Sequence, residues 1–239
     1  MIRILALATV PVWGLLTFFY VRDVYEREPR VLLVRLFLHG VLITIPAAVI
    51  GVLAAGLLEG LVSSQSPLYL LVENFIFIAL VEEGLKYWVV RRQAYHHPAF
   101  NEPYDGMLYA IFASLGFAAL ENILYVAQGG TRVAVARALL SVPAHALFAS
   151  TMGYFLGRAR FARTARREEQ MLRAALVLPV LLHGVYDLLL STGNVSLMWG
   201  IVPFSLAMWI MALRQMRLSH RRSPFRAAAE QELPGEDEK

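Results

Sequence analysis

Glutamate and histidine side chains recur inside stretches of the sequence that are otherwise almost entirely apolar. One such stretch, IALVEEGLKYWVVRR from Ile78 to Arg92, contains the adjacent carboxylates Glu82 and Glu83, followed by Lys86. Later apolar stretches contain the polar residues Glu121, Asn122, Arg137, His145, His183 and Asp187. Because an ionisable side chain at the centre of a membrane helix costs about 2.5–3.5 kcal/mol, each of these residues indicates a partner or a function.

The residue types favour hydrolysis by a metal-bound water. The chain has no cysteine, so only carboxylates and imidazoles are available to hold a metal ion. They are the ligands of catalytic zinc, which keeps three protein ligands and one open position for water. The ion lowers the pKa of that water to about 7, and a nearby carboxylate accepts its proton as it attacks a peptide carbonyl. The predicted ligands are Glu121, His145 and His183, with Asp187 beside them, and the predicted base is Glu82 or Glu83.

A metal-free mechanism uses the same residues. The sequence contains no HExxH motif, so the spacing alone does not identify a zinc protease. A glutamate can activate water directly while a histidine or Asn122 stabilises the oxyanion. Both mechanisms stay open on the residues alone.

Each charge also has a purely structural explanation, because intramembrane charges tend to pair with one another. Residues four apart lie on one helix face, so Lys86 can neutralise Glu82 and Asp187 can orient His183. Arg137 can neutralise Glu121 from the neighbouring span. Pairing does not explain why four separate stretches each contribute a glutamate or a histidine, and we therefore expect one shared site.

The composition requires a membrane protein of the all-α class. Of the 239 residues, 58% are hydrophobic and 17% are charged, against roughly 45–50% apolar residues in a soluble domain. Apolar runs long enough to cross a hydrocarbon core of about 30 Å predict a bundle of about seven transmembrane helices. The predicted spans are Ile2–Tyr20, Arg35–Leu58, Pro67–Val90, Tyr104–Ala127, Val133–Gly157, Met171–Ser191 and Ser196–Leu213.

The charge distribution predicts the orientation of the spans. Arginine is concentrated after spans one, three, five and seven, whereas the other loops contain only Arg132. Since positive loops stay on the cytoplasmic side, the N-terminus is predicted outside and the C-terminus in the cytoplasm. The net charge of +4 is explained by this topology and requires no nucleic-acid partner. The predicted organisation is one membrane domain, residues 1–218, and a charged, disordered tail, residues 219–239.

Helix geometry refines the fourth span. At about 1.5 Å per residue, a start at Tyr104 places Glu121 about 25 Å from the cytoplasmic end, whereas the histidines lie about 18 Å deep in their spans. With a helix start near Ala110, Glu121 lies about 17 Å from the cytoplasmic end, at about the same depth as the histidines. We therefore expect NEPYDGM to form a loop before this helix.

Four motifs in this order resemble the PrsW family of bacterial intramembrane proteases. They are EEGLK with Glu82, Glu83 and Lys86, FAALEN with Glu121 and Asn122, VPAHALFAS with His145, and HGVYD with His183 and Asp187. The resemblance implies a glutamate-dependent or metal-dependent protease that cleaves a membrane-anchored protein such as an anti-sigma factor. It also implies a relation to the CAAX prenyl proteases, although Glu121 stands where those enzymes have a histidine.

Other classes fit the sequence less well. A transporter could use the same carboxylates and histidines as a proton or cation pathway, but the sequence lacks the repeated halves typical of transporters. A rhomboid-type serine site lacks the first glycine of its motif at Ser114, and an aspartyl site lacks a GxGD partner. A non-catalytic scaffold would tolerate Glu82→Gln and Glu83→Gln, whereas a protease would not.

Overall fold

The structure is a computed structural model that describes residues 2–64 and 66–227, and every regular element in these residues is a helix. The elements are α1 (Ile2–Tyr20), α2 (Arg30–Glu59), α3 (Pro67–Val72), η1 (Glu73–Leu80), α4 (Val81–Gln93), α5 (Pro103–Leu139), α6 (Ser141–Arg160), α7 (Ala165–Ser191), α8 (Val195–Met198) and α9 (Ile201–His220). The predicted helical-bundle class is confirmed. The end of the predicted tail, residues 228–239, lies outside the described residues.

Four helical stretches of the described chain are long and apolar enough to cross a membrane. They are Arg30–Glu59, Pro103–Arg160, Ala165–Ser191 and Val195–His220. The passage from Pro67 to Gln93 is divided among α3, η1 and α4, and α1 adds a shorter apolar helix, Ala6–Tyr20. The chain is an integral membrane protein, and the count of seven crossings stays a prediction.

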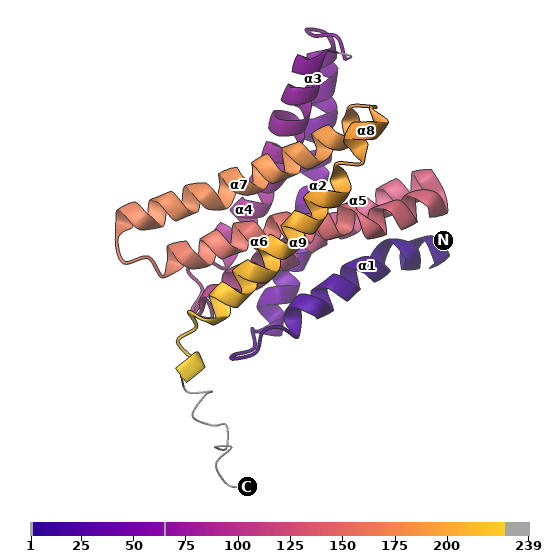
Figure 1. The fold of residues 1–239 in the computed structure, drawn as a ribbon. Helices are drawn as coiled ribbons and strands as arrows, with labels where there is room; N and C mark the ends of the chain where they lie inside the picture. Colours follow the sequence, from indigo (N-terminus) through magenta and orange to yellow (C-terminus); the bar gives the residue numbers. More distant parts are fainter. Residues whose placement is uncertain (1, 65, 228–239) are drawn as a thin grey trace.

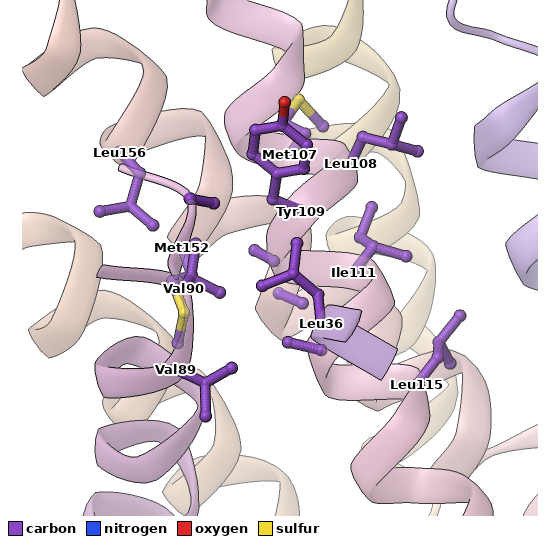
Figure 2. Close-up of a cluster of buried hydrophobic side chains, with 14 of the residues drawn as sticks. Leu36, Val89, Val90, Met107, Leu108, Tyr109, Ile111, Leu115, Met152 and Leu156 are labelled. Atoms are coloured by element: carbon purple, nitrogen blue, oxygen red, sulfur yellow. The ribbon is translucent and has the colours of Figure 1, made fainter. Parts of the chain in front are cut away.

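Helix α5 forms the centre of the bundle and packs against α1, α2 and α6 (Figure 1). Every side chain from residue 103 to residue 111 is buried. Figure 2 shows the apolar core around this segment, where Met107 and Ile111 of α5 lie among Leu36 of α2, Val89 of α4 and Met152 of α6. The core therefore fixes α4, α5 and α6 relative to one another.

Glycines allow α5 and α6 to approach closely. A Cβ atom added to Gly153 would lie 2.2 Å from the carbonyl oxygen of Gly106, and one added to Gly157 would lie 2.2 Å from that of Pro103. Small residues at such crossings let membrane helices pack backbone against backbone. This contact sets the register between the helix that carries Glu121 and the helix that carries His145.

The predicted late start of the fourth span is wrong, because α5 begins at Pro103. Asp105 Oδ2 accepts hydrogen bonds from the backbone N–H groups of Asn101, at 2.9 Å, and Glu102, at 2.8 Å, and so caps the first turn. Gly106 faces α6 instead of lipid. Asp105 and Gly106 would make a poor first turn for a helix exposed to lipid, but this segment is buried in protein.

The predicted start of the fifth span lies close to a break in α5. Gly130 has non-helical backbone angles, with φ +65° and ψ −156°, so Pro103–Leu139 is two helices joined at a kink, and the predicted start at Val133 falls three residues after it. The chain turns back there, because Arg137 contacts Glu121 at 2.8 Å whereas 16 residues of straight helix would span about 24 Å. A second break at Leu140 precedes α6, which begins at Ser141, and Pro143 suits this first turn because a first turn does not use its missing backbone N–H.

Candidate active site

Four helical segments bring the predicted polar residues together. Glu82 and Glu83 lie in the first turn of α4, directly after the π-helical segment η1. Glu121 lies on α5, His145 on α6 and His183 on α7. A π-helix changes the rotation of the chain by its wider turn and is frequent at functional sites. The segment η1 therefore sets the direction in which the two glutamates leave α4.

Lys86 is the centre of the hydrogen-bond network. Its ammonium group is fully buried and donates to Glu83 Oε1 at 2.7 Å and to Glu82 Oε2 at 3.2 Å. It also lies 3.2 Å from His145 Nδ1 and 4.3 Å from the centroid of the Phe117 ring. The predicted pairing of Lys86 with Glu82 is present, and Lys86 also contacts Glu83, because residues three apart on a helix are neighbours as well as residues four apart.

His183 connects the α4 carboxylates to α7. Its Nδ1 lies 3.0 Å from Glu83 Oε1, and its Nε2 lies 3.1 Å from Asp187 Oδ2. Phe148 stacks on the ring with centroids 4.8 Å apart. Because both ring nitrogens face carboxylate oxygens, both act as donors in this arrangement. A metal ion bound to the ring would replace one of these protons.

Glu121 contacts His145 of α6 and Arg137 near the end of α5. Its Oε2 lies 2.9 Å from His145 Nε2 and 2.8 Å from a guanidinium nitrogen of Arg137. Since the lysine beside His145 Nδ1 can only donate, Nδ1 is the acceptor and Nε2 carries the hydrogen that is donated to Glu121. The predicted pairings of Glu121 with Arg137, Glu82 with Lys86 and Asp187 with His183 are all present. Further contacts join different helices, from Glu83 to His183 and from Glu121 to His145.

Asn122 lies away from the other candidates. Its Nδ2 donates to the carbonyl oxygen of Ala8 at 2.7 Å, and its Oδ1 accepts from Arg137 Nε at 2.8 Å. The side chain is fully buried and is not among the residues that line the cavity described next. In this structure Asn122 holds α1 and Arg137 in place.

A cavity of about 750 Å³ lies over the network. Five of the predicted site residues line it: Glu82, Glu121, His145, His183 and Asp187. Helix α2 also contributes to the lining, through residues that include Thr44, Ala47, Gly51 and Ala55. Glu83 and Lys86 do not line it, so Glu82 is the member of the glutamate pair that faces the cavity.

The cavity also contains residues that the motifs did not point to as functional. Tyr186 lines it and lies one helical turn after His183, which was the available signal. Asn74 lines it from η1, and its Nδ2 donates to Ser191 Oγ at 2.9 Å and to the carbonyl oxygen of Leu70. No short-range pattern marks Asn74, because its partner Ser191 lies far away in the sequence.

The donor atoms fit a divalent metal ion, although not as the predicted trio. One ligand atom each from Glu82, Glu83 and His183 lie within 4.8 Å of one another. Glu83 Oε2 is buried and has no hydrogen-bond partner in the described structure, so it has unused capacity to bind a cation. Glu121 and His145 bond to each other instead of joining this group. The assignment of Glu121, His145 and Asp187 as ligands stays a prediction.

The site is thus a buried set of carboxylates and imidazoles beside a cavity within an integral membrane bundle, an arrangement suited to hydrolysis inside the membrane. Comparison with known families agrees, because residues 28–213 match the model of the PrsW family intramembrane metalloproteases. The chain belongs to the PrsW family.

Curated relatives support the same membership over almost the whole chain. The protein is 43% identical over 219 residues to the protease PrsW of Geobacillus kaustophilus, which covers 91% of this chain and 92% of that one. It is 36% identical over 217 residues to the protease PrsW of Bacillus subtilis, with 91% and 95% covered, and 31% identical over 230 residues to that of Clostridioides difficile, with 92% and 93% covered. No solved structure matches. These matches give no support to a transporter, and the relation to CAAX prenyl proteases stays an expectation.

Proposed function

We propose that the protein is an endopeptidase that hydrolyses peptide bonds of a membrane-anchored protein substrate, which by resemblance to the family is similar to an anti-sigma factor. The observation that carries this proposal is the cavity that Glu82, Glu121, His145 and His183 line from four helical segments. A half-open cavity with convergent ionisable groups can hold a water molecule and admit a peptide bond.

Glu82 is our choice for the general base. It faces the cavity, and its carboxylate is positioned by Lys86, whose ammonium group lies 3.2 Å away. Water adds to the peptide carbonyl carbon while Glu82 accepts a proton from it, and the same proton then passes to the leaving amine as the C–N bond breaks. Glu83 is fully buried and contacts both Lys86 and His183, so it fixes the positions of these two side chains.

The role of Glu82 as base belongs to the metal-free form of the proposal. In the metal-dependent form, Glu82, Glu83 and His183 would instead hold a divalent ion, with zinc as the expected ion because the ligands combine imidazole and carboxylate. When bound, such an ion acidifies water and polarises a carbonyl group. Without a metal, His145 is better placed than Asn122 to stabilise the oxyanion, since it lines the cavity and Asn122 does not; its Nε2–H, which donates to Glu121 in this structure, would then turn to the oxyanion.

The substrate and the membrane orientation are part of the same proposal. The wall of small residues on α2 leaves room for a peptide segment that enters from the bilayer. Arginine-rich loops support a bacterial inner membrane protein with its C-terminus in the cytoplasm.

Quantitative proteomics of membrane fragments tests the proposal. Cells that express the wild type are compared with cells that express the Glu82→Gln, Glu83→Gln double variant, with Glu169→Gln as a control because this glutamate is exposed on α7. Fragments cut within or beside a transmembrane segment should be present with the wild type and the control and absent with the double variant. Identical fragments in all three samples would exclude the proposed activity.

A further inference from the structure

A second cluster of acidic side chains lies at the end of the bundle where the α1–α2 connection meets the start of α5. Asp23 is 4% exposed, and Glu102 and Asp105 are fully buried. One carboxylate oxygen from each of the three lies within 4.8 Å of the others. Asp105 and Glu121 are 16 residues apart on one helix, which corresponds to about 24 Å, so this cluster is separate from the cavity.

Four oxygens of this cluster have no hydrogen-bond partner in the described part of the chain. They are both carboxylate oxygens of Glu102, Oδ1 of Asp23 and Oδ1 of Asp105. The remaining oxygens are already used, since Asp105 Oδ2 accepts from two backbone N–H groups and Asp23 Oδ2 accepts from Glu28 N at 3.3 Å. Buried carboxylate oxygens are normally paired, so four unpaired ones in one place indicate a missing partner.

The missing partner is not a basic side chain among the ion pairs of the described residues. None of those ion pairs uses Asp23, Glu102 or Asp105. The neighbouring Arg22 lies over the Phe18 ring, at 4.7 Å from its centroid. A fourth acid, Glu28, is also buried and accepts from the hydroxyl of Tyr109, which enlarges the negative cluster.

Electrostatics agree with the geometry. Burial raises the pKa of Asp23 to about 7, and the charge of Glu102 contributes to the rise. Burial likewise raises the pKa of Glu28 to about 7. Burial and the neighbouring acids therefore disfavour the charged forms of these carboxyl groups, and a cation among them would stabilise the charged forms.

We propose that Asp23, Glu102 and Asp105 form a second cation site, which binds a hard divalent ion of the Mg²⁺ or Ca²⁺ class. The donor atoms are all oxygens, which suit these ions, whereas the cavity site offers imidazole as well. The ion would connect the α1–α2 connection to the first turn of α5. Its role is structural, because it lies too far from the cavity to touch a substrate there.

Thermal unfolding of the purified full chain in detergent tests this site. The protein is treated with EDTA, dialysed to pH 7.5 and titrated with Mg²⁺ or Ca²⁺ in separate arms while tryptophan fluorescence is followed. A ligand that binds only the folded state raises the Tm, and we expect a rise of about 5 °C at saturation with at least one of the two ions. The rise should persist in a Glu83→Gln, His183→Ala variant, which disables the proposed cavity site.

Two variants of the cluster and one control decide the outcome. Asp23→Asn and Glu102→Gln should each lose the rise in Tm, while Glu169→Gln should keep it, because Glu169 is an exposed acid on α7 outside the cluster. Equilibrium dialysis with radioactive Ca²⁺ should give one bound ion fewer for Asp23→Asn than for the wild type if Ca²⁺ is the ion that stabilises. No rise with either ion, or an equal rise in Asp23→Asn, would overturn the proposal in favour of carboxyl groups that share protons.

Discussion

The two acidic clusters of this protein differ in what compensates their charge. In the cavity cluster Lys86 contacts Glu82 and Glu83, and Arg137 contacts Glu121, so every glutamate has a basic neighbour. In the cluster of Asp23, Glu102 and Asp105, no ion pair of the described structure provides such a neighbour. The comparison teaches that acids with a fixed basic neighbour do not depend on a bound cation to offset their charge, whereas acids without such a neighbour do.

The largest expected effect is on catalysis at the compensated cluster. Glu82→Gln should lower kcat by about 10²–10⁴-fold, because an amide cannot accept the proton of the attacking water. The measurement is cleavage of a fluorogenic peptide or an identified substrate in detergent or liposomes. Asp23→Asn is the matched acid-to-amide control and should retain kcat when divalent cations are present. Equal losses in the two variants would remove the functional distinction between the clusters.

The next largest effect is on the free energy of unfolding, through Lys86, the basic partner of Glu82 and Glu83. Lys86→Met should lower the free energy of unfolding by about 3–5 kcal/mol, because it leaves Glu83 and Glu82 without their buried counter-charge. Denaturant titration in detergent measures it. The control is Arg173→Met, since the Arg173–Glu169 pair is 75% and 62% exposed and should contribute less than about 1 kcal/mol. A Lys86→Met variant as stable as the control would show that the cavity carboxylates are compensated in another way.

The metal content of purified variants distinguishes the two proposed sets of metal ligands, Glu82, Glu83 and His183 or Glu121, His145 and His183. Purified protein should hold about one zinc or other divalent transition-metal ion per chain, and His183→Ala should lower the affinity for it by at least about 10-fold, since it removes the only imidazole of the converging group. Elemental analysis after gel filtration measures the content. Replacement of His145 by Ala should leave the content nearly unchanged if Glu82, Glu83 and His183 hold the ion. If the content falls as far with His145→Ala, the trio predicted from the sequence is the better assignment.

The sequence predicted those parts of the site that depend on one helix. Residues four apart gave the pairs of Glu82 with Lys86 and of His183 with Asp187, now at 3.2 Å and 3.1 Å. Membrane depth and motif order placed His145 near them. The helical class followed from apolar run length alone. These inferences needed only helix geometry and the cost of charge in lipid.

Features that arise between helices could not be predicted in this way. The π-helical segment η1 has no sequence signature, and it decides which glutamate faces the cavity. The start of α5 was misplaced because burial against Gly153 and Gly157 of α6 is a tertiary property. The second acidic cluster has no sequence signature, since Asp23 and Glu102 lie far apart in the sequence and meet only through packing.

The smallest expected effect concerns Asn122. This side chain accepts a hydrogen bond from Arg137, the basic neighbour of Glu121, and so holds the arginine in place. Asn122→Ala removes the acceptor for Arg137 Nε and the donor to Ala8, and we expect a loss of about 1–3 kcal/mol in the free energy of unfolding, measured by denaturant titration. We expect kcat to fall less than with Glu82→Gln, because Arg137 keeps its direct contact with Glu121. Asn122→Asp is the companion variant, since it keeps an acceptor for Arg137 but loses the donor to Ala8. If Asn122→Ala instead lowers kcat as far as Glu82→Gln while stability is unchanged, the amide acts on the reacting atoms, and the catalytic role predicted from the sequence motif holds against its position in the structure.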